Sequence, residues 1–232
     1  MQIKELSWNQ LNTAEEVART ACQRILKIAR SAIAARGRFR IVLAGGTTPG
    51  RTYQLLAEAE ADWFHWHLYF GDERCLHPTD SERNSWMVEQ AWTGQVGIPL
   101  LQIHPIQAEL GPELGAANYS QLINSTLPFD LVLLGMGEDG HTASLFPGHK
   151  HPADSPVVAV YDAPKPPPER VSLSATTLGN CRHLLYLITG ASKEQAVAAW
   201  RKGEVLPINQ IRPMGSSEVL IDAAAWNNGV EP

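Results

Sequence analysis

Short apolar runs that end in glycine-rich or charged loops recur along this 232-residue chain, and they constrain its fold more than any other feature. The runs are Phe39 to Ala44, Trp66 to Phe70, Phe129 to Leu134 and His183 to Thr189. A continuous apolar run of this length is typical of a strand that is buried on both faces. Because helical patterns follow the first, second and fourth runs, the sequence predicts an α/β protein with a mostly parallel sheet covered on both faces.

Local signals mark where the other elements begin and end. Thr13 and Glu16 form a capping box that starts a long amphipathic helix, which lasts until Gly37. The segment Tyr161 to Glu169 contains four prolines, so it predicts an extended arm rather than a helix or a central strand. The run Glu218 to Ile221 indicates a final strand.

Composition narrows the class of protein. With 44% hydrophobic and 19% charged residues, residues 1–232 are expected to fold as a single α/β domain. The formal charge of −5 argues against a broad nucleic-acid-binding surface, which would need clustered Lys and Arg. The stretch Met1 to Trp8 lacks the pattern of a signal peptide, and no apolar run reaches about 18 residues, so we expect a cytoplasmic protein without membrane contact. Three cysteines at long spacings indicate free thiols.

The loop after the first strand-like run combines Gly45, Gly46, Thr47 and Thr48 at the start of a helix. Backbone amides and hydroxyls at a helix N-terminus favour an anion such as a phosphate. The alternative is a tight turn in which Thr48 caps the helix. In an open α/β sheet the loops after the parallel strands share one edge, so this loop is expected to lie beside the other strand-end loops.

The second loop holds Asp72, Glu73, Arg74 and Cys75. Arg74 could bind a phosphate through two hydrogen bonds, and either acid could orient it or act as a base. Cys75 beside Arg74 could instead be an activated thiol, although the sequence supplies no particular base for it.

The third loop runs from Gly135 to Gly148 and contains several glycines and one histidine. Glycines such as Gly137 let the backbone approach a ligand closely, and His141 can exchange a proton near neutral pH. We therefore expect His141 to be a general base.

The remaining candidates are two cations and two histidine pairs. Arg170 ends the proline-rich arm, and Lys193 follows the last of the four apolar runs. The pairs His65/His67 and His149/His151 have a spacing that can bind metal, but no further ligands accompany them, so no metal site is expected.

Six motifs, in this order, resemble the 6-phosphogluconolactonase family. They are AGGTTPG (Ala44 to Gly50), GDERC (Gly71 to Cys75), ERNS (Glu82 to Ser85), LLGMGEDGHTASLFPG (Leu133 to Gly148), PPPERVSLS (Pro166 to Ser174) and TGASK (Thr189 to Lys193). The related amino-sugar isomerases share the glycine-rich histidine loop but continue toward an Asn-Glu-Pro ending, where this chain reads TASLFP.

The resemblance implies a three-layer α/β/α fold, shared with glucosamine-6-phosphate isomerase, ribose-5-phosphate isomerase A and the CoA transferases. It also implies hydrolysis of 6-phospho-D-glucono-1,5-lactone to 6-phosphogluconate, the second step of the oxidative pentose phosphate pathway. The expected partner is this small sugar phosphate, and the chain is expected to be a monomer or a weak homo-oligomer that needs no cofactor.

Within such a site, His141 would activate water and Asp139 would orient the loop or the imidazole. Amides of the turn from Gly137 to Gly140, or a nearby cation, would stabilise the oxyanion. The residues expected to bind the phosphate and the sugar are Gly45, Gly46, Thr47, Thr48, Asp72, Arg74, Asn84, Gly137, Arg170 and Lys193.

Two other functions fit parts of the pattern. In an aldose–ketose isomerase, an acid such as Asp72 would move a proton between carbons. A sugar-phosphate sensor is the non-enzymatic alternative, but the sequence shows no additional helix-turn-helix segment or basic stretch.

Overall fold

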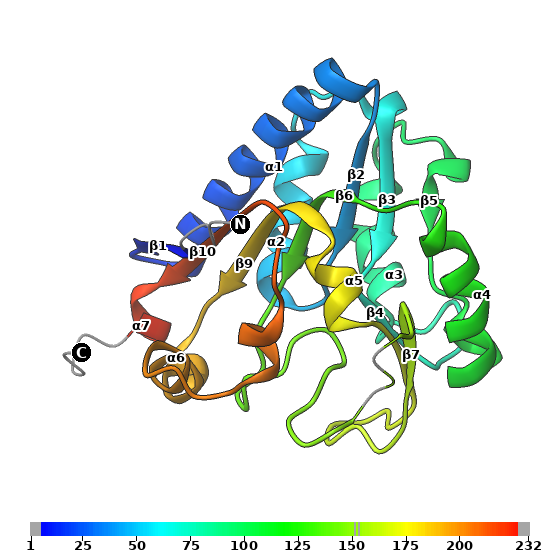
Figure 1. Ribbon diagram of the computed structural model, residues 1–232. Coiled ribbons are helices and arrows are strands. Elements are labelled where there is room, and N and C mark those ends of the chain that lie inside the picture. Colours follow the sequence, from blue (N-terminus) through cyan, green and yellow to red (C-terminus); the bar gives the residue numbers. More distant parts are fainter. Residues whose placement is uncertain (1–5, 151, 153, 227–232) are drawn as a thin grey trace.

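A twisted sheet of seven parallel strands forms the centre of the protein in the computed structural model, which describes residues 6–150, 152 and 154–226 (Figure 1). Its strands lie in the order β1 (Leu6–Leu11), β10 (Ser216–Asp222), β9 (Cys181–Ile188), β6 (Phe129–Leu134), β2 (Phe39–Leu43), β3 (Trp66–Phe70) and β5 (Ile103–His104). Every pairing in this sheet is parallel, so the carboxyl ends of all seven strands lie at one edge. The predicted parallel sheet is confirmed.

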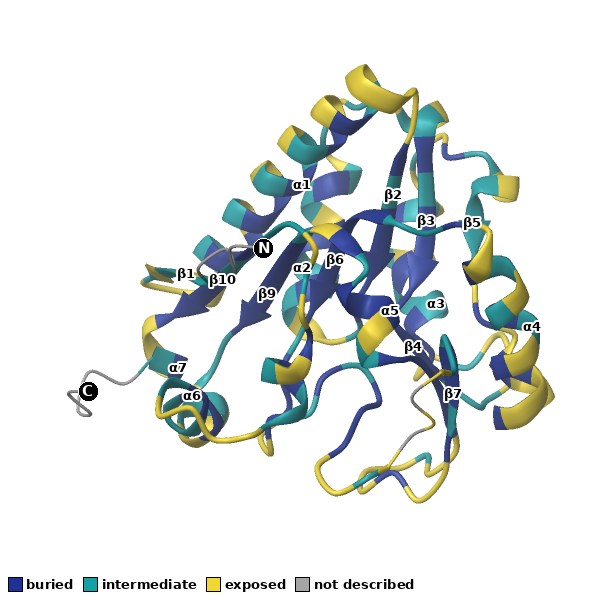
Figure 2. Ribbon diagram, in the orientation of Figure 1, coloured by how far each residue is buried: buried dark blue, intermediate teal, exposed yellow. Residues whose placement is uncertain are grey.

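Helices cover both faces of the sheet and complete three layers. They are α1 (Ala14–Arg36), α2 (Thr47–Ala57), α3 (Asn84–Val88), α4 (Pro112–Asn124), α5 (Ala175–Gly179), α6 (Glu194–Arg201) and α7 (Ala223–Trp226). In Figure 1, α2 lies behind the sheet and α5 in front of it. Helix α1 packs against α2 and against β2, β6, β9 and β10. Its buried residues face the sheet and its exposed residues face outward (Figure 2).

The caps of α1 agree with the sequence signals. Thr13 is the N-cap, and its hydroxyl accepts a hydrogen bond from the amide of Glu16 at 3.2 Å. The carboxylate of Glu16 accepts from the amide of Asn12 at 2.8 Å, one residue earlier than in the usual capping box. Gly37 ends the helix with φ of 70°, a conformation that is costly for residues with a side chain.

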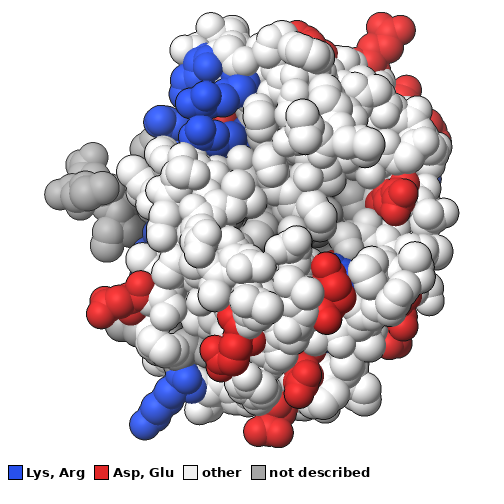
Figure 3. Space-filling model, turned by 90° about the vertical axis from the view of Figure 1, so that its right-hand side faces the viewer, with Lys and Arg blue, Asp and Glu red and all other residues white. Residues whose placement is uncertain are grey.

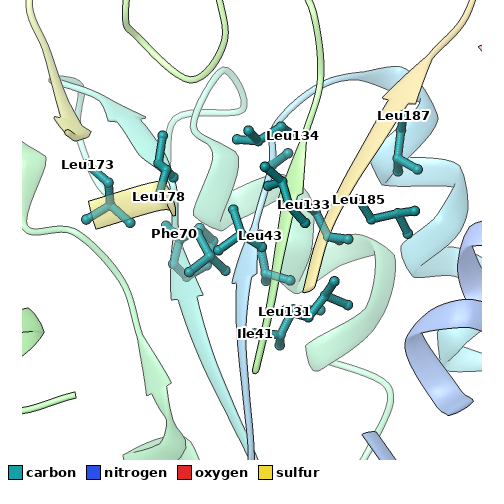
Figure 4. Close-up of a cluster of buried hydrophobic side chains, with 14 of the residues drawn as sticks. Ile41, Leu43, Phe70, Leu131, Leu133, Leu134, Leu173, Leu178, Leu185 and Leu187 are labelled. Atoms are coloured by element: carbon teal, nitrogen blue, oxygen red, sulfur yellow. The ribbon is translucent and has the colours of Figure 1, made fainter. Parts of the chain in front are cut away.

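The core lies between the central strands and the layers on either side. All six residues of β6 are buried, which explains why its sequence is almost entirely apolar. Figure 4 shows Ile41 and Leu43 of β2 beside Phe70 of β3 and the leucines of β6 and β9. Leu178 of α5 extends this cluster toward the loop that follows β3.

A second, antiparallel sheet of three strands lies beside the main one. Its order is β4 (Asp72–Arg74), β8 (Arg170–Leu173) and β7 (Val157–Val160). The sequence predicted a loop at residues 71–75, and this was wrong for its centre, because Asp72, Glu73 and Arg74 pair with β8. The proline-rich segment of residues 161–169 connects the antiparallel strands β7 and β8, so the predicted arm is the connecting loop of a β-hairpin.

Edge strand β1 was not predicted, because its sequence mixes polar and apolar residues and none of its six residues is fully buried. It pairs with β10, so the first and last strands of the described chain are neighbours. On the face shown in Figure 3, acidic side chains are scattered and Lys and Arg gather in few places, so the described residues form no broad basic surface there. Among the described residues, none of the helices has the length and the apolar character needed to cross a membrane.

Candidate active site

A pocket of about 450 Å³ opens at the carboxyl edge of the main sheet. Loops that follow β2, β3, β6 and β9 line it, as the strand-end argument predicts. Eleven of the twelve predicted site residues line this pocket: Gly45, Gly46, Thr47, Thr48, Asp72, Arg74, Asn84, Gly137, His141, Arg170 and Lys193. The twelfth, Asp139, does not line the pocket but contacts His141. A larger cavity of about 850 Å³ adjoins the pocket and shares Thr47, Thr48 and Arg74 with it.

His141 and Asp139 form an acid–imidazole pair. Nδ1 of His141 lies 2.5 Å from Oδ1 of Asp139, and the same oxygen accepts the backbone amide of His141 at 3.1 Å. Burial by itself raises the pKa of Asp139, but the hydrogen bonds and the charge of His141 outweigh it and hold the pKa below its ordinary value. Because Nδ1 is engaged by the acid, Nε2 is the nitrogen left for chemistry in the pocket.

Gly137 makes room for the imidazole. A Cβ atom at this position would lie 2.1 Å from Nδ1 and from Cε1 of His141, so a side chain there would displace the imidazole. The amide of Gly137 donates to the carbonyl of His141 at 2.8 Å, and the amide of Gly140 donates to the carbonyl of Gly137 at 3.1 Å. The hypothesis that this turn stabilises an oxyanion is therefore wrong for these two amides, because the loop already uses them.

The first loop presents a helix N-terminus to the pocket. Helix α2 begins at Thr47, and its N-cap is Gly46 with φ of 109° and no side-chain capping bond. The reading of Thr48 as the N-cap is wrong, since its hydroxyl instead pairs with the hydroxyl of Thr189 at 2.6 Å. The uncapped first turn leaves backbone amides suited to an anion at the pocket wall.

Asp72 faces the pocket from a buried position. Its carboxylate accepts hydrogen bonds from the hydroxyl of Ser144 at 2.6 Å and from the side-chain amide of Asn84 at 3.1 Å. A Cβ atom at Gly45 would lie 2.1 Å from Oδ1 of Asn84, so the glycine is needed for Asn84 to lie against the first loop. Asn84 thus joins the first loop to the second.

Glu73 has a different role from its neighbour. It is completely buried, and its carboxylate accepts the backbone amides of Arg74, Asn84 and Ser85 at 2.8 to 2.9 Å. Nε of Arg83, which is also buried, lies 3.5 Å from Oε2 of Glu73. The sequence left open whether an acid orients Arg74, and in the structure the guanidinium of Arg74 donates to the carbonyl of Glu82 instead.

Four cationic side chains line the pocket, one more than the sequence predicted. Nε of Arg170 donates to the carbonyl of Pro167 at 3.1 Å, and Nη2 donates to that of Lys165 at 2.8 Å. Burial lowers the pKa of Arg170, while the charge of Asp72 acts in the opposite direction. Lys165, in the proline-rich segment, was missed; its position five residues before Arg170 in an arm next to the site was the available signal.

Lys193 lies in the loop after β9. The carboxylate of Asp222 accepts the amide of Gly190 at 3.0 Å and fixes the start of this loop. Burial lowers the pKa of Lys193, and the charges of Glu138 and Asp139 partly compensate. Lys193 therefore lies within electrostatic reach of the loop that carries His141.

Two alternative chemistries find no support at this site. Burial, together with the charge of Glu169, raises the pKa of Cys75 to about 11, so its thiol is not activated. Nδ1 of His65 lies 2.8 Å from Asp62, and His67 stacks on His104. No group of three metal-ligating side chains occurs among the described residues, and His151 of the other histidine pair lies outside them.

Comparison with known proteins finds relatives along most of the chain. The family model described as glucosamine-6-phosphate isomerases/6-phosphogluconolactonase matches residues 12–221. A 6-phosphogluconolactonase from Mycobacterium leprae is 37% identical over 195 residues, which are 77% of this chain and 79% of that protein. One from Streptomyces coelicolor is 35% identical and covers 91% of this chain and 90% of its own length.

Solved structures show the same fold. The structure of 6-phosphogluconolactonase from Trypanosoma brucei superposes with a TM-score of 0.89 at 25% identity, covering 98% of this chain and 100% of that one. A monomeric glucosamine-6-phosphate deaminase, at 21% identity, shares the fold with a TM-score of 0.84 and covers 95% of this chain and 98% of its own. The chain belongs to the glucosamine-6-phosphate isomerase/6-phosphogluconolactonase family.

Proposed function

We propose that this protein is a lactonase that hydrolyses 6-phospho-D-glucono-1,5-lactone to 6-phosphogluconate, the second step of the oxidative pentose phosphate pathway. The observation that carries this proposal is an imidazole, held by a carboxylate, that lines the same 450 Å³ pocket as Arg74, Arg170, Lys193 and a helix N-terminus. The imidazole suits ester hydrolysis, and the cationic side chains and the helix N-terminus suit a phosphate on the same small molecule. The named relatives support the choice of substrate.

In this mechanism, Nε2 of His141 removes a proton from a water molecule as its oxygen attacks the lactone carbonyl carbon. Asp139 holds the proton on Nδ1 and stabilises the imidazolium that forms. When the tetrahedral intermediate collapses, the bond from the carbonyl carbon to the ring oxygen breaks, and the imidazolium returns its proton to that oxygen. The products are a carboxylic acid, which ionises, and a free hydroxyl, so the cycle needs no metal or cofactor.

The cationic side chains of the pocket would bind negative charge at two places on the substrate, the phosphate and the developing oxyanion. Arg74, Arg170 and Lys193, together with the first turn of α2 at Thr47 and Thr48, bind the phosphate and so hold the lactone against His141. Since the amides of Gly137 and Gly140 are already used, stabilisation of the oxyanion would fall to another amide of that turn or to a cationic side chain of the pocket. Asp72 and Asn84, which also line the pocket, would hydrogen-bond the sugar hydroxyls.

The test is an assay of freshly generated 6-phosphogluconolactone with and without the protein, corrected for spontaneous hydrolysis. We expect ring opening to be accelerated at protein concentrations far below that of the substrate. In D₂O, NMR should show no deuterium on carbon, whereas an isomerase with Asp72 as its base would introduce it. Hydrolysis at the spontaneous rate would contradict the proposal.

A further inference from the structure

The proline arm, residues 161–169, brings a lysine to the pocket that the proposed mechanism does not use. Lys165 lines the pocket, and its Nζ lies 3.4 Å from a carboxylate oxygen of Glu138. Glu138 belongs to the loop that carries His141. The pair therefore connects the arm to the catalytic loop beside the pocket.

The backbone of the arm is fixed more firmly than the side chain of its lysine. Arg170 donates to the carbonyls of Lys165 and Pro167, and the amide of Ala163 donates to the carbonyl of Pro168 at 3.0 Å. The side chain of Lys165 remains 62% exposed and that of Glu138 54% exposed. The ammonium group can therefore change its partner while the arm stays in place.

The contact between Lys165 and Glu138 is easily replaced. At 3.4 Å it is longer than a good charge-assisted hydrogen bond, and exposed ion pairs add little to stability. A phosphate offers more negative charge and three acceptor oxygens. Lys193 lies near enough that the charge of Lys165 lowers its pKa, after the larger effect of burial, so an anion between the two lysines relieves their repulsion.

We propose that Lys165 is a substrate-binding residue that leaves Glu138 and binds the phosphate of the incoming sugar phosphate. Glu138 then acts as an internal competitor that occupies the ammonium group while the pocket is empty. This inference rests on the proposed function for the identity of the phosphorylated ligand. It makes opposite predictions for the two partners of one ion pair, which a purely structural contact would not.

The first test removes the lysine. We expect Lys165→Met to raise KM for 6-phosphogluconolactone about tenfold and to change kcat by less than twofold. Its kcat/KM for unphosphorylated glucono-1,5-lactone should stay unchanged, and Lys165→Arg should restore most of the affinity. Lys27→Met, on the exposed face of α1, is the matched control for loss of a lysine and should leave KM unchanged.

The second test removes the competitor. Glu138→Gln should lower KM for the phosphorylated lactone about two- to threefold, and should have no effect when Lys165 is already Met. A double-mutant cycle measures this coupling directly. Titration with 6-phosphogluconate by calorimetry gives the same comparison for binding alone.

The outcomes separate this inference from the proposed function. Wild-type turnover above the spontaneous rate tests the function, and the ratios between variants test the role of Lys165. Equal losses on both lactones in Lys165→Met would overturn the inference, because the lysine would then act through the arm. A gain from Glu138→Gln that persists in the Lys165→Met background would also overturn it, because Glu138 would then act by its own charge.

Discussion

The segments that follow β3 and β6 each place two acidic residues near a basic one, but they use these charges in opposite ways. After β3, Glu73 is completely buried and binds three backbone amides and Arg83. After β6, Asp139 is 42% exposed and pairs with a histidine at the pocket. The first arrangement stabilises a corner of the fold, and the second provides a group that can accept a proton.

The difference teaches how to interpret charged residues at strand ends. Position at the carboxyl edge brings a residue close to a ligand, but its partners decide its role. A carboxylate surrounded by backbone amides is fully occupied, whereas one that holds an imidazole makes that imidazole a better base. Exchanging charge for neutral isosteres in the two loops should therefore affect different properties.

The largest effect is expected from Glu73→Gln. It removes one charge of a buried ion pair and weakens three amide hydrogen bonds, so the free energy of unfolding should fall by about 3 to 5 kcal/mol. Urea denaturation measures this. Glu138→Gln, the same change at an exposed site of the other loop, is the control and should alter stability by less than about 0.5 kcal/mol. A similar small loss in both variants would remove the distinction between the loops.

His141→Ala should have the next largest effect, on catalysis rather than on stability. Loss of the general base should lower kcat about 10²-fold, or about 2.7 kcal/mol in activation free energy. Circular dichroism and urea denaturation should show a folded protein of nearly unchanged stability. His77→Ala, at an exposed histidine outside the pocket, is the control and should keep full activity. Full turnover in His141→Ala would mean that another group activates the water.

Asp139→Asn should lower kcat less, about tenfold, because the amide can still contact the ring but cannot stabilise the imidazolium by charge. In the His141→Ala background the same substitution should have little further effect, since the two residues act as a unit. Initial-rate measurements on the four proteins give the coupling. Additive losses would show that Asp139 acts on the substrate without His141.

Cys75→Ser should have the smallest effect, although Cys75 directly follows Arg74 at the end of β4. Because burial and the charge of Glu169 raise the pKa of its thiol to about 11, the group stays protonated at neutral pH. We expect unchanged kcat and slow alkylation of Cys75 by iodoacetamide at pH 7.5, with the rate rising toward pH 11. Rapid alkylation accompanied by loss of activity would assign the thiol a catalytic part.

Much of the architecture followed from the sequence because the central strands are buried on both faces. The four central strands, β2, β3, β6 and β9, were recognisable as apolar runs. Because they are parallel, the loops at their carboxyl ends lie at one edge and form the pocket there. Edge strand β1 and the strand at Asp72–Arg74 were not recognisable, because pairing on one side only, or with a distant hairpin, leaves no continuous apolar pattern.

The sequence predicted which residues line the pocket better than it predicted their hydrogen-bond partners. Sequence position brought Asp72, Arg74 and His141 to one edge, yet it could not show that Arg74 binds a backbone carbonyl or that Glu73 turns inward. Such preferences depend on which donors other segments provide. A monomeric or weakly associating chain in the cytoplasm remains a prediction of the sequence alone.

The hydrogen bonds from Gly190 and Ala225 to Asp222 have a consequence for biosynthesis. Strand β10, which ends at Asp222, is translated after every segment that lines the pocket. The carboxylate of Asp222 nevertheless fixes the loop that carries Lys193. A nascent chain that stops before residue 216 would already contain each pocket residue but would lack this anchor. Catalytic competence should therefore arise late in synthesis, when the final strand inserts between β1 and β9.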